Sequence, residues 1–145
     1  MSLYLNELKP RKALNKAFLK VKPNRNEIEG FKRNLIKLID TINETESEEF
    51  HKNLVSDFLK NTYYKQNHFI NTKGKNDLVI HNGNVANTTV GVIIETKKPT
   101  NKKEMVSKDN INAKAFQELV LYYLRERITI KNTNVKHLII TCIVS

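Results

Sequence analysis

The sequence predicts an α/β domain built around a mixed sheet, and three observations carry this expectation. Apolar residues recur at helical spacing through the first 60 residues, and short β-branched runs between turn signals follow up to residue 97. An amphipathic segment at residues 113–127 then precedes a last apolar run, HLIITCIV, at residues 137–144. The resulting order of helix, three strands, helix and strand is typical of a small α/β domain whose sheet is flanked by helices.

Residues 1–43 are predicted to form a basic helical extension that packs on the rest of the chain. Pro10 suits the first turn of a short helix, which the Lys-Pro-Asn segment at residues 22–24 ends. A longer helix is expected from a capping box of Asn26 with Glu29. Its apolar stripe comprises Phe31, Leu35, Leu38, Ile39 and Ile42.

Residues 44–145 are predicted to form the core, and the two parts together make a single compact domain. A helix is expected from a second capping box, Thr45 with Glu48, to about Lys60. A first strand is expected within residues 63–70 and a second at residues 77–81, DLVIH. The segment HNGNVAN is rich in Asn and Gly and indicates a turn that leads into the third strand.

The third predicted strand, VGVIIETKKPTNKK at residues 90–103, carries two charges where it leaves the core. Its first residues are β-branched and apolar, and a Pro-Thr-Asn break ends it. Because side chains alternate along a strand, Glu95 and Lys97 lie on one face and Thr96 on the other. A buried charge must be paired or bind a metal, so an ordinary ion pair at a strand end and a functional site are both open.

The second and third strands are expected to pair as a hairpin because a short turn joins them. Asp77, at the start of one strand, would then face Glu95 and Lys97 at the end of the other. Two carboxylates held together suit a divalent cation with oxygen ligands, such as Mg²⁺, which could polarise a phosphodiester and help deprotonate water. Lys97 could orient that water or stabilise developing negative charge.

Asp77 lies 18 residues before Glu95, and Lys97 lies two residues after Glu95. With this pattern the sequence resembles the PD-(D/E)XK nuclease superfamily. Within it, the chain is most similar to the N-terminal nuclease region of combined restriction-modification (type IIG-like) enzymes. The segments that carry this resemblance span nearly the whole chain and are KALNKAFLKVKPNR, ETESEEFHKNLVSDFLKNTYY, KNDLVI, IIETKKP and AFQELVLYYLRER. Asn76 stands where the motif's name has proline.

The resemblance implies a restriction-endonuclease-like core (α-β-β-β-α-β) and a metal-dependent endonuclease. It implies that Asp77 and Glu95 bind Mg²⁺, for which Mn²⁺ can substitute, and that Lys97 lies at the attacking water. A glutamate from the preceding helix often joins such a metal shell; Glu48 is preferred over Glu49 by its place on the helical wheel, although Glu48 is also the capping-box residue. Gln117, on the apolar stripe of the later helix, could reach the site or be a satisfied core amide.

The resemblance also implies partners: duplex DNA, and a methyltransferase and target-recognition part of the same system. No glycine-rich loop for S-adenosylmethionine is present before the chain ends at TCIVS, so we expect a nuclease domain without its methyltransferase part, which need not be active alone. The sequence names no target site. One active site attacks one strand, so cleavage of both strands requires a dimer or a second binding event.

A net charge of +10 favours a polyanionic partner such as duplex DNA. Residues 1–40 are the more basic part, with ten Lys/Arg against four Asp/Glu. The DNA-binding candidates are Arg11, Lys12 and Lys16 in the extension, and Lys102 and Lys103 after the third strand. Such residues can also be a solvated helix face.

Composition narrows the remaining classes of protein. No apolar run approaches the ~18 residues of a membrane helix, and the N-terminus lacks the apolar centre of a signal peptide, so a cytoplasmic protein is expected. Cys142 is the single cysteine, which excludes an internal disulfide. Besides a metal-dependent endonuclease, two functions stay open: a catalytically idle nucleic-acid-binding module on the same fold, and a structural or interaction domain with an ordinary ion pair.

Overall fold

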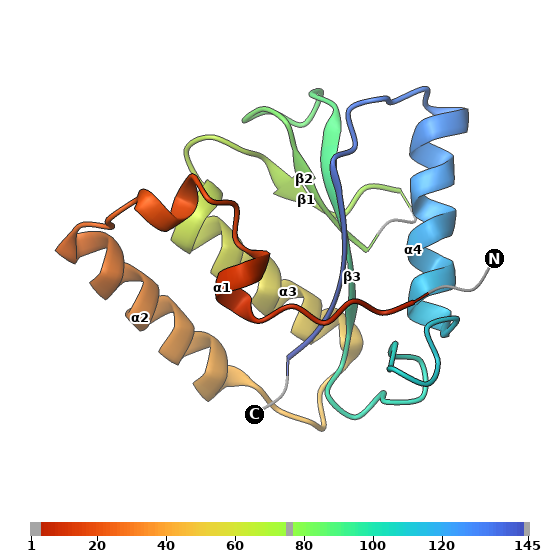
Figure 1. The fold of residues 1–145 in the computed structure, drawn as a ribbon, viewed down its shortest axis with the longest axis horizontal. Helices are drawn as coiled ribbons and strands as arrows, with labels where there is room; N and C mark the ends of the chain where they lie inside the picture. Colours follow the sequence, from red (N-terminus) through yellow and green to blue (C-terminus); the bar gives the residue numbers. More distant parts are fainter. Residues whose placement is uncertain (1–3, 75–76, 144–145) are drawn as a thin grey trace.

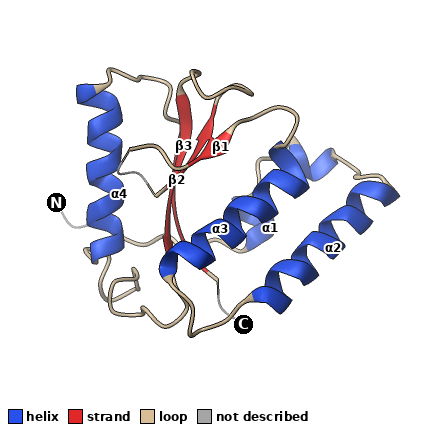
Figure 2. Cartoon of the chain, turned by 180° about the vertical axis from the view of Figure 1, so that it is seen from behind, coloured by secondary structure: helices blue, strands red, loops and turns tan. Residues whose placement is uncertain are grey.

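A mixed four-stranded sheet lies between two helical layers in the computed structural model, which describes residues 4–74 and 77–143 (Figure 1). Helix α4 (Lys114–Leu124) covers one face of the sheet. Helix α3 (Glu48–Leu59) covers the other face, and α2 (Arg25–Thr41) lies outside α3 (Figure 2). The α/β class and the mixed sheet predicted from the sequence are therefore confirmed.

The predicted N-terminal helix is present only as fragments. Helix α1 (Pro10–Ala13) is a single turn, and a short 3-10 turn, η1 (Phe18–Lys20), follows it. The backbone of Leu14 is extended, and the side chains of Leu14 and Phe18 are exposed. The apolar residues of this segment are thus poorly covered, and isolated helices of this length are marginal in water.

The two long N-terminal helices start at caps other than those predicted. Helix α2 begins after Asn24, which forms a reciprocal capping box with Glu27, two residues before the predicted pair of Asn26 and Glu29. The spacing of Asn and Glu is the same in both pairs, and the earlier start adds half a turn of hydrogen bonds. Helix α3 begins after Ser47, whose side chain accepts a hydrogen bond from the N–H of Phe50.

The first predicted strand, within residues 63–70, starts as helix and turn and becomes a strand only at its end. Helix α3 continues as a π-helical turn, η2 (Lys60–Tyr64), which contains both tyrosines assigned to that strand. Tyr63 packs against Phe31 of α2 and Phe58 of α3, so this aromatic contact holds the two helices together. Only β1 (Ile70–Asn71) is left as a strand.

The hairpin expected at the centre of the sheet is confirmed. Strand β2 (Leu78–His81) is antiparallel to β3 (Val90–Lys97), with Leu78 opposite Ile94. Strand β1 is antiparallel to β2 on the far side. Strand β4 (His137–Cys142) runs parallel to β3 and places Cys142 beside Lys97; Val144, the expected end of this strand, lies outside the described residues.

Two apolar clusters lie on opposite faces of the sheet. The cluster on the α3 face comprises Ile70, Leu78, Ile80 and Ile94, with Val55, Leu59, Tyr64 and Val92 around it. The cluster on the α4 face comprises Val79, Val90, Ile93 and Leu119, with Tyr122, Val135 and Ile140 around it. By alternation, Glu95 and Lys97 follow Ile93 onto the α4 face and Thr96 follows Ile94 onto the α3 face. A further π-helical turn, η3 (Arg125–Thr129), continues α4.

In the part of the chain that the structure describes, no helix is long and apolar enough to cross a membrane.

Candidate functional site

A buried ion pair stands at the C-terminal end of β3. Glu95 and Lys97 are only 2% and 3% exposed, and Lys97 Nζ lies 2.6 Å from Glu95 Oε1. They are neighbours because residues two apart in a strand share a face. The charge on each side chain therefore has a partner, as burial in this position requires.

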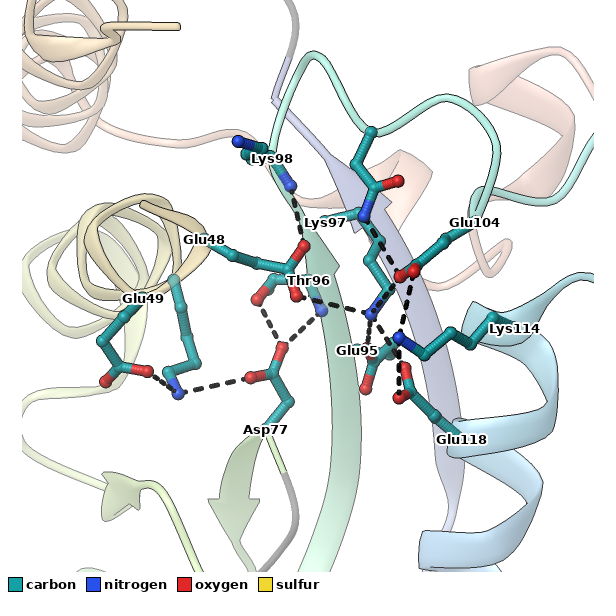
Figure 3. Close-up of polar contacts among 12 residues, drawn as sticks. Glu48, Glu49, Asp77, Glu95, Thr96, Lys97, Lys98, Glu104, Lys114 and Glu118 are labelled. Carbon is teal, nitrogen blue, oxygen red and sulfur yellow. Dashed lines mark hydrogen bonds and ion pairs between the residues drawn. The ribbon is translucent and has the colours of Figure 1, made fainter. Parts of the chain in front are cut away.

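Three further carboxylates surround the Lys97 ammonium group, each from a different element (Figure 3). Glu118 of α4 is nearest, with Oε2 2.8 Å from Nζ. Glu48, the first residue of α3, lies 3.4 Å away, and Glu104, from the loop after β3, lies 3.6 Å away. Two helices, a strand and a loop thus meet at this one lysine.

Asp77 contacts β3 just beside this cluster. Its Oδ2 accepts a hydrogen bond from the N–H of Thr96 at 2.6 Å and a second from the Thr96 hydroxyl. Its Oδ1 lies 3.3 Å from Nζ of Lys52 on α3, and Lys52 also pairs with Glu49. The Asp77 carboxylate is consequently oriented by β3 on one side and by a largely buried lysine on the other.

Burial and neighbouring charges shift the pKa values of the site. Burial raises the pKa of Glu95 to about 7, and the negative charge of Asp77 and a contact with Glu118 act in the same direction against the opposing effect of Lys97. The second carboxylate oxygen of Glu95, Oε2, is buried with no hydrogen-bond partner. Burial alone would lower the pKa of Lys97, but Glu118 and Glu95 raise it overall, so Lys97 stays protonated.

A family model, described as a domain of unknown function (DUF7149), matches residues 8–145. The chain belongs to the DUF7149 family. Neither a curated protein nor a solved structure matches the chain.

Four of the side chains predicted for the site come together in the DUF7149 domain. Glu95 and Lys97 are in direct contact, Glu48 reaches Lys97, and Asp77 is fixed to Thr96 between them. The capping box expected of Glu48 is absent, because Ser47 caps α3 and the hydroxyl of Thr45 donates to Asn43 instead. Glu48 Oε2 also lies 3.5 Å from the backbone N–H of Lys98. Asn76 lies outside the described residues.

Gln117 is not part of this cluster. Its side chain is exposed, and its amide group donates to the backbone and side-chain oxygens of Asn112. Ala115 and Leu119 face the sheet, and a residue two positions from both is turned about 200° away at 100° per residue. Gln117 is thus neither at the site nor a core amide, and its neighbour Glu118 takes the place expected of it.

Sequence reasoning missed Glu118, Glu104 and Lys52. Glu118 follows Ala115 by three residues and precedes Tyr122 by four, so a carboxylate on the sheet-facing side of the amphipathic helix was a usable signal. Glu104 lies in an irregular loop, where no periodicity indicates a direction. Lys52 lies one turn after Glu49, but nothing in the sequence links it to Asp77.

The predicted DNA-binding side chains lie elsewhere on the surface. Arg11 and Lys12 in α1, Lys16 after it, and Lys102 and Lys103 after β3 are all exposed. Lys108 of the same loop pairs with Glu7 at 2.9 Å. This contact brings the loop close to the N-terminal arm, the part of the basic extension that precedes α2.

The carboxylates of the DUF7149 site suit a hard cation, although no three Asp, Glu, His or Cys side chains of the described ranges are already arranged as metal ligands. Around Lys52, Lys97 and Lys114 stand six carboxylates: Glu48, Glu49, Asp77, Glu95, Glu104 and Glu118. A bound cation would offset this excess of negative charge and give the unpartnered buried Oε2 of Glu95 a partner.

Proposed function

We propose that this domain is a metal-dependent DNA endonuclease domain that hydrolyses phosphodiester bonds as part of a restriction-modification system. The observation that carries the proposal is a buried, protonated Lys97 in contact with Glu95 and Glu48, with one oxygen of Glu95 unpartnered and with Asp77 hydrogen-bonded to the adjacent Thr96. A binding surface for DNA phosphates has no need of carboxylates at such a place. The resemblance of the Asp77, Glu95 and Lys97 pattern to PD-(D/E)XK nucleases supports the same function.

The donor set fits Mg²⁺ or Mn²⁺, which prefer carboxylate oxygens and water. Asp77 and Glu95 would hold the ion, with Glu48 as the third carboxylate. When bound, the metal would polarise the phosphodiester and lower the pKa of its water. Because Glu95 has a raised pKa, the ion competes with a proton at this carboxylate.

Lys97 supplies positive charge rather than a base. Its carboxylate neighbours keep it protonated, so its N–H groups can donate to the attacking water and to the oxygens on which negative charge develops. The exposed lysines and arginines of the extension and of the loop after β3 would contact the duplex phosphates. A methyltransferase and target-recognition part of the same system is the partner that would supply sequence specificity.

The alternative is a catalytically idle nucleic-acid-binding module. It is favoured by the contacts that the site already makes. Asp77 has its hydrogen-bond and ion-pair partners in Thr96 and Lys52. Lys97 occupies the space between Glu95 and Glu118. In that case the cluster is a structural ion-pair network, and DNA binding is independent of metal.

Metal titration and DNA cleavage distinguish the two functions. The wild-type chain, Asp77→Ala, Glu95→Ala and Lys97→Ala are titrated with Mg²⁺ and Mn²⁺ by calorimetry and incubated with supercoiled plasmid. We expect Asp77→Ala and Glu95→Ala to lose metal binding and nicking, and Lys97→Ala to lose nicking but keep most metal binding. DNA binding should survive or tighten in the two carboxylate variants, because negative charge is removed.

Gln117→Ala is the matched control, because Gln117 is exposed on α4 and contacts only Asn112 within the described hydrogen bonds. It should bind metal and nick DNA as the wild type does. Equal nicking by the wild type and Glu95→Ala contradicts the proposal. If the isolated chain does not nick DNA, metal binding decides, and a wild type that binds neither ion contradicts it as well.

A further inference from the structure

We propose that Glu118 of α4 is a positioning residue for Lys97: its carboxylate holds the ammonium group in place at the end of β3 while Glu95 and Glu48 bind metal. The contact itself is independent of the function proposed above, whereas its consequence for cleavage rests on that function. The contact and the consequence can therefore be tested separately.

The distances single out Glu118 among the neighbours of Lys97. Of the four carboxylates that the structure describes around Nζ, only Glu95, at 2.6 Å, and Glu118, at 2.8 Å, are within normal hydrogen-bond distance. Glu95 is a proposed metal ligand, and a carboxylate that turns to a cation no longer holds the lysine to the same extent. Glu118 is then the remaining short contact, and it comes from an element that supplies no proposed metal ligand.

The helix that carries Glu118 packs closely on the sheet. Ala115 is fully buried and Leu119 nearly so, and these residues lie three positions before and one after Glu118. Their close packing fixes the position of the Glu118 backbone relative to the sheet. Glu118 is thus suited to keep a long, flexible lysine side chain in one conformation.

Glu104, in the loop after β3, lies next to the contact between Glu118 and Lys97. Its backbone oxygen accepts a hydrogen bond from Ala115 N–H, and its side chain contacts Lys114 at 2.9 Å and Asn101 at 3.1 Å. Lys114 also lies 3.9 Å from Glu118. The start of α4 and the loop are therefore joined by charged groups on both sides of the lysine.

If Glu118 is removed, the short contact that opposes the pull of Glu95 and Glu48 on the ammonium group is lost, and of the four described carboxylates around Lys97 only Glu104, 3.6 Å away, still opposes it. Lys97 would then lie between the carboxylates proposed to bind the ion, where it competes with metal and no longer faces the attacking water. Residues that orient the groups of a metal site typically change activity by ~10–100-fold when mutated. We expect a loss of that size in the nicking rate of Glu118→Ala.

The contact is tested by NMR of the Lys97 ammonium protons in ¹⁵N-labelled, metal-free protein without DNA. Protons of a buried ammonium group in short hydrogen bonds exchange slowly enough to be seen, unlike those of exposed lysines, and Lys97→Arg assigns the signal. We expect the signal in the wild type and in Gln117→Ala, its loss in Glu118→Ala, and an intermediate result in Glu118→Gln. The glutamine keeps an acceptor oxygen without the charge and is nearly the same size, so it controls for misfolding.

An unchanged Lys97 signal in Glu118→Ala or Glu118→Gln overturns the contact, whatever the nuclease assay gives. For the consequence, nicking is measured at saturating Mn²⁺. A fall in rate for Glu118→Ala, a smaller fall for Glu118→Gln and none for Gln117→Ala supports it. Equal rates in Glu118→Ala and the wild type overturn it. Should no variant nick DNA, the NMR result still decides whether Glu118 holds Lys97.

Discussion

Glu95 combines nearly complete burial with a carboxylate oxygen that no hydrogen bond satisfies. Lys97 neutralises it only in part, because the same ammonium group also serves Glu118 and because Asp77 adds a nearby negative charge. The protein therefore holds a proton on Glu95 at pH values where an exposed glutamate has lost it. This proton links the stability of the metal-free fold to pH.

The pKa of Glu95 is raised from an ordinary 4.5 to about 7, so between these values the folded chain binds a proton that the unfolded chain has released. Stability conferred by this proton is fully present below about pH 4.5 and is lost as the pH rises through about 7. We expect the metal-free wild type to lose on the order of 3 kcal/mol from this group over that interval, because a pKa difference of one corresponds to about 1.4 kcal/mol. Urea unfolding at closely spaced pH values measures it.

Glu95→Gln removes the titrating group and keeps its size, so it isolates this contribution from those of the other carboxylates. The difference between wild type and Glu95→Gln should change steadily between pH 5 and pH 7.5 in the direction of lower wild-type stability. A difference that stays constant over this range contradicts the raised pKa.

At the scale of the element, the start of α3 determines where Glu48 lies. Ser47 caps the helix, so Glu48 is its first residue and its side chain is free to reach Lys97. The N-terminus of a helix also favours the negative charges of Glu48 and Glu49. The predicted cap at Thr45 would instead have used the Glu48 side chain for the helix itself.

Ser47→Ala should cost about 1 kcal/mol of stability, because the N–H of Phe50 loses its partner. Thr45→Ala is the matched control, since the Thr45 hydroxyl contacts only the neighbouring Asn43 in the described structure, and it should change stability by less than about 0.5 kcal/mol. Urea unfolding of the three proteins checks this. A larger effect at Thr45 than at Ser47 would show that α3 starts where the sequence pattern placed it.

At the scale of the whole molecule, basic side chains lie close to the acidic site. The site is rich in carboxylates, and exposed lysines and arginines lie in the N-terminal arm and in the loop after β3, as well as on α2. The ion pair of Lys108 with Glu7 holds these two segments next to each other (Figure 1). In the function proposed above, these basic segments would hold the duplex beside the site, and a metal ion bound to the carboxylates would meet the scissile phosphate.

If the arm contacts DNA, each lost phosphate contact should reduce the log–log salt slope of duplex binding by about 0.9. The triple variant Arg11→Ala, Lys12→Ala and Lys16→Ala should flatten the slope and weaken binding to all sequences alike, with metal binding unchanged. Binding measured between ~50 and ~200 mM salt checks this. The double variant Lys102→Ala, Lys103→Ala tests the loop in the same way. If the triple variant has the same slope as the wild type, the arm is a solvated scaffold, and the DNA contacts must then lie in the loop.

The local pattern of apolar, polar and turn residues was sufficient to predict an element wherever neighbours along the chain decide its structure. The β-branched run and the turn before it predicted β3 and its hairpin, and strand alternation placed Glu95 and Lys97 on one face. The same kind of reasoning was wrong where two local patterns compete. The tyrosines of η2 suit a strand, but packing against Phe31 and Phe58 keeps them helical.

The sequence by itself determined the pair of Glu95 and Lys97 at the end of β3 and the class of the fold. The alternation of side chains along a strand and the turn before β3 suffice for both. Only the tertiary structure decided which carboxylates meet Lys97. Glu48, Glu104 and Glu118 come from a helix, a loop and another helix, and their meeting depends on how each element is rotated against the sheet. One step along a helix turns a side chain by about 100°, so the rotation of α4 against the sheet decided that Glu118 lies at the site and Gln117 in solvent.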